Sequence, residues 1–215
     1  MIKNIIWDVD GTLFDTYPAM TFAYSKLLKE LALSMPLNEI HELVRQSLGH
    51  CERTLSQRFQ VDPELLRRNF SDTYRQISLA NQSPFPGAAA VCAFIRERGG
   101  LNLIVTHRGV ASTRRLLQTH DLMQYFEEII SVEQGYPRKP DPAMFLAAIE
   151  RFNLNGKTTA HASTLAVGDR AIDIQAGRAA GLPTCLFGME KLAEPADYQI
   201  THYSQLLALL KEDGE

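Results

Sequence analysis

Carboxylate side chains occur at two distant places in this sequence, in patterns that can do chemistry. The first segment reads Asp8-Val9-Asp10-Gly11-Thr12 and the second reads Gly168-Asp169-Arg170-Ala171-Ile172-Asp173. Two further segments, Thr106-His107-Arg108-Gly109 and Arg138-Lys139-Pro140, add a hydroxyl group and a lysine. Carboxylates gathered at one place cannot all ionise unless a cation neutralises them. A hard divalent ion with oxygen ligands solves this, and Mg²⁺ is the usual choice where a phosphate supplies further oxygens.

The same residue types suit phosphoryl transfer. A carboxylate that faces phosphorus can attack it and form an aspartyl-phosphate. A second carboxylate two residues further on can protonate the leaving alcohol and then activate water. The lysine and the backbone N–H groups near Gly11 and Gly109 can hold the phosphoryl oxygens beside the metal. These segments therefore predict phosphate-ester chemistry, provided that the fold brings them together.

Short apolar runs predict the strands that must position these segments. They are rich in Ile, Val and Leu and cover residues 4–7, 101–106, 128–132, 164–168 and 184–187. Helical patterns alternate with them over residues 87–98, 110–120, 142–149 and 171–180, the third with Asp141 as its N-cap and Pro142 as its first residue. This alternation predicts an α/β fold, a Rossmann-like doubly wound parallel sheet. Ligands bind at the carboxyl ends of such strands, so we expect the segments to meet there.

Residues 16–81 break the alternation, because they show helical periodicity and no strand. Helices with apolar stripes need a small core of their own. We therefore predict a helical cap at 16–81, inserted into a catalytic core of residues 1–15 and 82–215. Within the cap, Gly49–Arg53 interrupts the helical pattern and is predicted to be a loop between helices that faces the site.

The four segments, in this order, resemble the motifs of haloacid dehalogenase-superfamily hydrolases. The resemblance is to the phosphatase branch with a helical cap, which includes phosphoglycolate phosphatases and β-phosphoglucomutases, and it runs from Ile5 to about Phe187. It implies that Asp8 is the nucleophile and a metal ligand. It implies that Asp10 is the general acid/base, with its backbone carbonyl on the metal. The cap would close over the substrate and choose the leaving group.

The resemblance also assigns roles to the later segments. Thr106 hydrogen-bonds the phosphoryl group, and Lys139 neutralises the nucleophile and the phosphate. Asp169 ligates Mg²⁺, and Asp173 supports the metal directly or through water. The family often has Asn at the position of His107, so this chain departs from the pattern there.

Candidate substrate-binding residues complete the predicted site. In the core they are Gly11, Thr12, His107 and Arg108, and in the cap they are His50 and Arg53. The alternative for His107 is a hydrogen-bonding loop residue, and for Arg108 it is contact with solvent. For His50 and Arg53 an ordinary turn with an exposed arginine is the alternative, and for Asp173 the alternative is a first-turn acid that the helix dipole favours.

Other functions remain open at this point. Relatives that attack carbon place Tyr at the position of Asp10, so Asp10 favours a phosphate ester. Phosphomutases of the β-phosphoglucomutase type keep this Asp but place a hydrophobic residue at the position of Thr12, so Thr12 favours a hydrolase. A phospho-switch of the receiver type would be far shorter, with its aspartate after a later strand. We predict a phosphatase, with a phosphomutase as the alternative.

Composition limits the binding partners and the cellular location that we expect. Net charge is −3, hydrophobic residues make up 45% and charged residues 22%, so a nucleic-acid or polybasic membrane surface is not expected. No apolar run approaches the ~18 residues of a membrane span. Three cysteines without metal-site spacing are typical of a reducing cytosol. We expect a soluble cytoplasmic enzyme, a monomer or small homo-oligomer, acting on a small phosphorylated metabolite.

Overall fold

The computed structural model describes residues 1–154 and 163–212, and the chain divides into two compact units. The core unit consists of Met1–Phe14 and Pro84–Glu215, and the helical unit consists of Asp15–Ser83. The structure thus assigns Asp15, Gln82 and Ser83 to the helical unit, whereas the predicted cap runs from residue 16 to residue 81.

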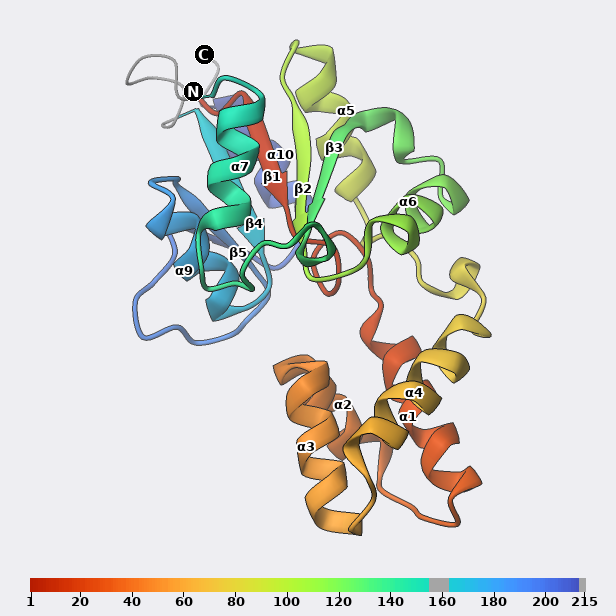
Figure 1. The fold of residues 1–215 in the computed structure, drawn as a ribbon. Helices are drawn as coiled ribbons and strands as arrows, with labels where there is room; N and C mark the ends of the chain where they lie inside the picture. Colours follow the sequence, from red (N-terminus) through yellow and green to blue (C-terminus); the bar gives the residue numbers. More distant parts are fainter. Residues whose placement is uncertain (155–162, 213–215) are drawn as a thin grey trace. The chain divides into compact units, whose positions relative to one another are not determined.

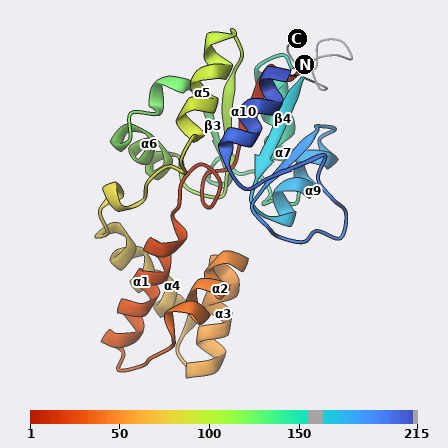
Figure 2. The same cartoon turned by 180° about the vertical axis from the view of Figure 1, so that it is seen from behind.

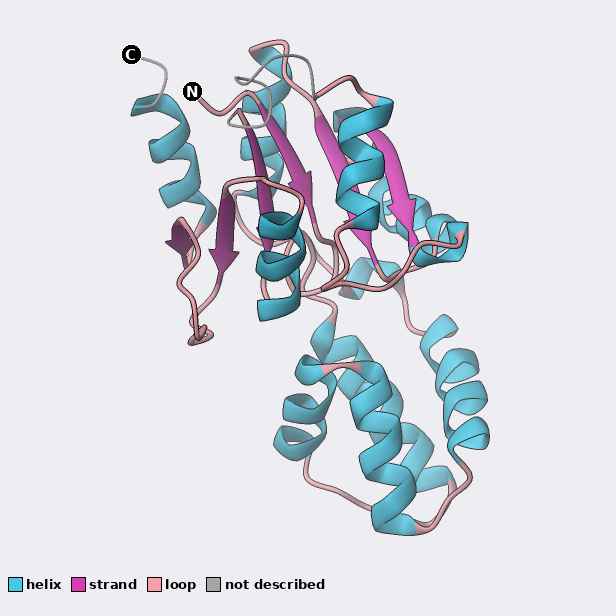
Figure 3. Cartoon of the chain, turned by 60° about the vertical axis from the view of Figure 1, so that its left-hand side comes forward, coloured by secondary structure: helices cyan, strands magenta, loops and turns pink. Residues whose placement is uncertain are grey.

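A parallel sheet forms the centre of the core unit, and its strands all point the same way (Figures 1 and 3). In the described residues its strand order is β3-β2-β1-β4-β5-β6. The strands are β1 (Asn4–Trp7), β2 (Asn102–Thr106), β3 (Phe126–Ser131), β4 (Thr164–Gly168), β5 (Thr184–Phe187) and β6 (Tyr198–Ile200). Because β1 pairs with both β2 and β4, the segments that follow these three strands leave the sheet side by side.

Helices cover both faces of the sheet. In Figures 1 and 2, α7 (Ala143–Arg151) and α9 (Ala171–Ala179) lie on one face, with α5 (Ala88–Glu97) and α10 (Tyr203–Glu212) on the other. The helix α6 (Val110–Thr119) contacts β3 near the edge of the sheet. Apolar side chains of β1, β2, β3 and β4 pack against α7 and α9 in one continuous core. The predicted doubly wound α/β class is therefore confirmed.

Several element boundaries differ from the prediction. The third strand begins at Phe126 and ends at Ser131, and the helix that follows it begins at Ala143. Pro142 is the N-cap of that helix, and Asp141 Oδ1 instead accepts the N–H of Ala143 at 2.9 Å. Neither β6 nor α10 was predicted from the sequence. The strand β6 has only three residues, two of them exposed, so it carries no apolar run.

The helical unit consists of helices joined by short turns (Figure 3). They are α1 (Tyr17–Glu30), α2 (Leu37–Gln46), α3 (Leu48–Phe59), α4 (Pro63–Arg75) and the short η1 (Leu79–Asn81). They surround their own apolar core, in which the rings of Tyr24 and Phe70 stack at 4.2 Å between centroids. This packing supplies the separate core that the apolar stripes require.

The segment Gly49–Arg53 is helical, so the prediction of a loop was wrong. It belongs to the first turns of α3, whose N-cap Ser47 accepts the N–H of His50 through Oγ at 3.0 Å. That cap starts a new helix one residue after α2 ends. The interruption in the apolar pattern therefore marks a change of helix direction.

Among the helices of residues 1–154 and 163–212, none combines the length and the apolar content that crossing a bilayer requires.

Candidate active site

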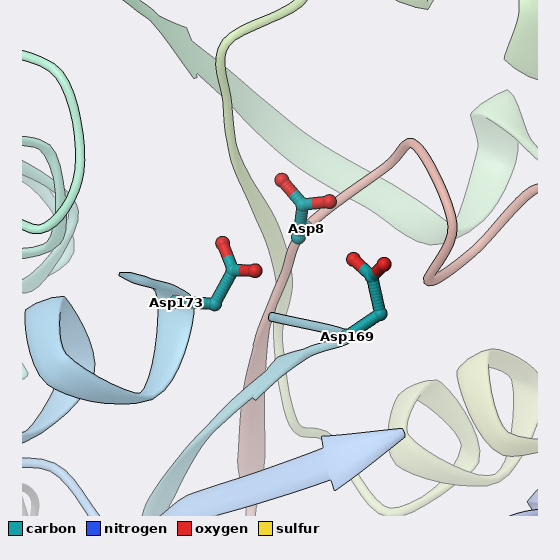
Figure 4. Close-up of side chains that lie close together, drawn as sticks. All are labelled: Asp8, Asp169 and Asp173. Carbon is teal, nitrogen blue, oxygen red and sulfur yellow. The ribbon is translucent and has the colours of Figure 1, made fainter. Parts of the chain in front are cut away.

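Three carboxylates converge at the carboxyl end of the central strands (Figure 4). Asp8 follows β1, Asp169 follows β4 and Asp173 lies in the first turn of α9. One oxygen from each lies within 4.8 Å of the others, and the three residues are only 3%, 5% and 2% exposed. Asp8 is held beside β4 because its N–H donates to Val167 O at 2.9 Å. The parallel sheet thus brings together residues more than half the chain apart in sequence.

Lys139 joins two of these carboxylates. Its Nζ donates to Asp8 Oδ1 and to Asp173 Oδ1, both at 2.7 Å, and its side chain is fully buried. Burial alone would lower the pKa of Lys139, but the charges of Asp173 and Asp8 outweigh it and raise the pKa above its usual value. The lysine therefore stays charged.

The two carboxyl groups that share this lysine respond differently. Burial raises the pKa of Asp8 to about 6, against the opposing charge of Lys139. Burial would also raise the pKa of Asp173, but the charges of Lys139 and Arg170 and a hydrogen bond from the Arg170 N–H, at 3.2 Å, hold it below its usual value. Asp173 is therefore the carboxylate that keeps its charge most firmly.

The donor set fits a divalent cation. Three buried carboxylates face one buried lysine and the nearby charge of Arg170, so the negative charges still outnumber the positive ones. Within the described residues, Asp8 Oδ2 is buried and has no hydrogen-bond partner. Hard divalent ions prefer carboxylate oxygens, so Asp8, Asp169 and Asp173 form a cluster that can bind such an ion. The prediction that Asp10 adds a ligand concerns its backbone carbonyl and stays a prediction.

The side chain of Asp10 lies outside this cluster and pairs with Arg108. Arg108 Nη1 donates to Asp10 Oδ1 at 2.7 Å. The guanidinium is itself held by Ser112, since Nε donates to Ser112 Oγ at 3.0 Å. The backbone of Arg108 is held by Ser131, whose Oγ donates to the Arg108 carbonyl at 2.8 Å. The structure therefore places Arg108 against the predicted acid/base, where its charge orients the Asp10 carboxylate.

His107 contacts the segment that carries the lysine. Its Nε2 accepts the backbone N–H of Lys139 at 2.9 Å. Burial and the charges of Lys139, Arg138 and Arg170 lower the pKa of His107 to about 3. The imidazole is therefore neutral at physiological pH, as an acceptor must be. At the position where the family often has Asn, this histidine holds the backbone of Lys139.

The remaining predicted residues of the core unit mostly shape the turns. The Gly11 N–H donates to Phe14 O at 2.9 Å, and Gly11 has a φ of 82°, a conformation that favours glycine. Thr12 is buried, and its Oγ1 donates to Asp169 Oδ1 at 3.1 Å. Thr106 Oγ1 accepts the N–H of Arg108 at 3.0 Å. Gly109 is the N-cap of α6. The roles of these residues toward a substrate stay predictions.

The two predicted cap residues lie in the helical unit. His50 Nε2 and Thr54 Oγ1 are 3.4 Å apart within α3, and the guanidinium of Arg53 lies beside Gly49. Their proposed role in specificity stays a prediction.

Three residues that support the site, Gly168, Ser131 and Ser112, were not among the predicted site residues. A Cβ atom on Gly168 would lie 2.2 Å from the Cβ of Asp173, so only glycine lets β4 end this close to α9. Ser131 and Ser112 brace Arg108, as described above. The serines have no local signal, since each is an ordinary polar residue until the fold gives it a partner. Gly168 did have a local signal, because it directly precedes the second pair of aspartates, Asp169 and Asp173.

Comparison with known proteins agrees with this geometry. The haloacid dehalogenase-like hydrolase family matches residues 2–181. A phosphoglycolate phosphatase of Nitrosospira multiformis is 32% identical over 187 residues, which cover 84% of this chain and 80% of that protein. An N-acetylmuramic acid 6-phosphate phosphatase of Pseudomonas putida is 29% identical over 189 residues, 85% of this chain and 81% of that protein.

A solved structure agrees at the level of the fold. It is a haloacid dehalogenase-superfamily hydrolase of subfamily IA from Geobacter sulfurreducens, with a TM-score of 0.74 and 23% identity. The match covers 97% of this chain and 96% of that one. With the family match over most of the chain, the predicted resemblance is confirmed: this chain belongs to the haloacid dehalogenase-like hydrolase family.

Proposed function

We propose that this chain is a Mg²⁺-dependent phosphatase that hydrolyses a small phosphomonoester through an aspartyl-phosphate on Asp8. The observation that carries the proposal is the cluster of Asp8, Asp169 and Asp173 around Lys139 at the carboxyl end of the central strands. Asp8, Asp169 and Asp173 would hold Mg²⁺, which when bound neutralises charge on the phosphoryl oxygens.

The chain's own residues carry the bond-making steps. A carboxylate oxygen of Asp8 attacks phosphorus, the bond from phosphorus to the leaving oxygen breaks, and Asp10 gives that oxygen a proton. Water then attacks the phosphorus of the aspartyl-phosphate and gives a proton to Asp10. The bond from phosphorus to Asp8 breaks, and inorganic phosphate is formed. Both carboxyl groups end in the state in which they began.

The neighbouring groups prepare these steps. Lys139, at 2.7 Å from Asp8, offsets the negative charge that an approaching phosphate adds. Arg108 fixes the direction of the Asp10 carboxylate, at 2.7 Å. His107 fixes the backbone at Lys139, at 2.9 Å. Orientation of this kind supplies much of the rate enhancement in phosphoryl transfer.

The relatives support the enzyme class and suggest a first substrate. The two curated relatives named above are phosphatases, and the predicted class, a phosphoric monoester hydrolase of this family, is confirmed. We propose 2-phosphoglycolate as the first substrate to test, followed by sugar phosphates and nucleoside monophosphates. The predicted cytoplasmic location and oligomeric state stay predictions.

Turnover of p-nitrophenyl phosphate by the purified chain tests the proposal. We expect phosphate release that depends on Mg²⁺ and stops in excess chelator. Asp8→Asn should abolish it, while Asp72→Asn, on an exposed face of α4, should leave it unchanged. Intact-protein mass spectrometry of Asp10→Asn after rapid quenching should show one added phosphoryl group. Full activity in Asp8→Asn or in chelator would refute the mechanism.

The phosphomutase alternative predicts a different product. The chain would be incubated with β-glucose 1-phosphate and a bisphosphorylated sugar, and both isomerisation and free phosphate would be followed. Isomerisation faster than phosphate release would favour a mutase. Phosphate release without isomerisation supports the phosphatase.

A further inference from the structure

A tyrosine of the last helix reaches into the segment that follows β1. Tyr203 is the first residue of α10 and lies beyond residues 2–181, which the family match covers. It is fully buried, and its hydroxyl donates to the backbone carbonyl of Thr12 at 2.8 Å. The two residues are 191 positions apart in sequence. An element that the family motifs do not include thus contacts the segment of Asp8 and Asp10.

The position of this hydroxyl is set by aromatic packing. The ring of Tyr203 stacks on Phe187 at 4.6 Å with an interplanar angle of 8°, and it meets the ring of Trp7 at 5.6 Å. A Cβ atom on Gly87 would lie 3.1 Å from the Cβ of Tyr203, so the glycine permits the close approach of α10. Burial raises the pKa of Tyr203 well above its usual value, so the hydroxyl keeps its proton and acts as a donor.

The contact continues to a predicted metal ligand. Thr12, which accepts from Tyr203 through its carbonyl, donates through Oγ1 to Asp169 Oδ1 at 3.1 Å. Thr12 is fully buried and Asp169 is 5% exposed, so solvent does not compete for either hydrogen bond. Groups that hydrogen-bond a metal ligand orient it, and their loss typically weakens metal affinity by about 10–100-fold.

We propose that Tyr203 is a positioning residue of the metal site, which fixes Thr12 and through it the carboxylate of Asp169. The proposal rests on the proposed function, because it requires that Asp169 holds a divalent cation. Most buried hydroxyls have a hydrogen-bond partner, but that partner need not support a metal ligand. Here the carbonyl of Thr12 accepts from Tyr203 of α10, and the hydroxyl of Thr12 donates to Asp169.

The test measures metal binding and not turnover. Tyr203→Phe removes one oxygen and keeps the ring stack. The probe is Mn²⁺, whose free concentration is read by electron paramagnetic resonance in a titration of the full chain without substrate. Because Tyr203 acts one contact further out than the groups that bond a ligand directly, we expect the dissociation constant for Mn²⁺ to rise by at most about tenfold and by at least about twofold. The matched control is Tyr24→Phe in the helical unit, which removes a buried hydroxyl that has no partner within the described residues. It should leave Mn²⁺ binding unchanged.

Variants of Thr12 test the route. Thr12→Val removes the hydroxyl that holds Asp169 and should weaken Mn²⁺ binding by about tenfold or more, whereas Thr12→Ser keeps it and should bind nearly normally. If Tyr203 acts through Thr12, Tyr203→Phe should add little in the Thr12→Val background. These variants also test the Asp169 contact without altering α10.

The outcomes separate this inference from the function on which it rests. Unchanged Mn²⁺ affinity in Tyr203→Phe, with a lower melting temperature in chelator, would show a purely structural tyrosine and overturn the inference. A full additional loss in the Thr12→Val background would overturn the route through Thr12. Phosphatase activity would survive as a conclusion in both cases. A wild-type chain that neither binds Mn²⁺ nor releases phosphate would refute the proposed function, and the inference with it.

Discussion

Replacing Lys139 by Met should be strongly destabilising, although it keeps a side chain of similar length. The lysine makes two hydrogen bonds of 2.7 Å to Asp8 and Asp173, and its side chain is 0% exposed. A hydrogen bond to a charged group contributes about 1.5–3 kcal/mol. Removing one partner of a buried ion pair costs about 3–5 kcal/mol, because the remaining charge is left uncompensated. We expect the free energy of unfolding to fall by about 3–5 kcal/mol at pH 8 in the absence of metal.

The loss of stability in Lys139→Met should depend on pH. Without Lys139, burial raises the pKa of Asp8 in the folded state still further above the unfolded value of 3.8, and Asp173 loses one of the two cations that hold its pKa down. A carboxyl group whose folded pKa is raised loses its contribution to stability as pH rises through that range. In the wild type, the contribution of Asp8 to stability is lost in this way as the pH rises from about 4 to about 6. Asp173, whose folded pKa is lowered, instead stabilises the fold at pH values above its unfolded pKa. The deficit of Lys139→Met should therefore be smaller at pH 4.5 than at pH 8.

The assay is urea unfolding in chelator, followed by the fluorescence of Trp7. This is the one tryptophan of the sequence, and it is buried in β1 directly before Asp8, so it reports on the core unit. The control is Arg151→Met in the same unit, which removes an ion pair of 3.7 Å to Glu128 whose side chains are 40% and 36% exposed. Exposed pairs contribute less than about 1 kcal/mol. A deficit below ~1 kcal/mol for Lys139→Met, or one that is equal at both pH values, would refute the reasoning.

Three further predictions concern single contacts. Gly168→Ala should push Asp173 away, since the new Cβ would lie 2.2 Å from the Cβ of that residue. A calorimetric melt should show that the free energy of unfolding falls by about 1–3 kcal/mol. Mn²⁺ binding should weaken too, and unchanged binding would contradict the displacement of Asp173. His107→Leu leaves the N–H of Lys139 without its acceptor and should cost about 1–3 kcal/mol in urea unfolding; His107→Gln, which keeps an acceptor, should recover most of it, and equal losses would argue against the contact. Gly49→Ala, in α3 with only ordinary contacts around the new Cβ, should stabilise the helical unit by about 0.5–1 kcal/mol in thermal melts followed by circular dichroism, and a lower melting temperature would contradict it.

Much of the fold could be predicted because its signals are local. Short apolar runs bounded on at least one side by Gly, Asp or Pro indicated β1, β2, β4 and β5 to within a residue at each end. Helical stripes indicated that residues 16–81 contain no strand. By contrast, the start of α3 was mistaken for a loop, because the capping of Ser47 looks the same in sequence as an interhelical turn. The C-terminal β6 was not predicted, since a three-residue strand has no pattern of its own. The helix α10 was not predicted either, although its buried residues Tyr203, Leu206 and Leu210 have helical spacing.

The sequence by itself determined which residues could gather. Asp8, Asp169 and Lys139 each follow a predicted strand, and parallel strands end at one edge of a sheet, so their convergence follows from the order of the elements. That reasoning requires only residue types and periodicity. The residue types also favoured phosphate chemistry, and the resemblance of the four motifs to those of haloacid dehalogenase-superfamily hydrolases pointed to the family.

Only the tertiary structure decided which hydrogen-bond partner each side chain around the site takes. Arg108 pairs with Asp10 across 98 positions, and Tyr203 reaches Thr12 across 191. His107 became an acceptor for the N–H of Lys139 because packing buried its ring among cations and kept it neutral. A hydrogen bond forms only if the donor–acceptor distance is right to within a few tenths of an ångström. The packing of whole helices and strands sets that distance. Periodicity and spacing along the chain carry no such information, so these contacts appear only once the chain has folded.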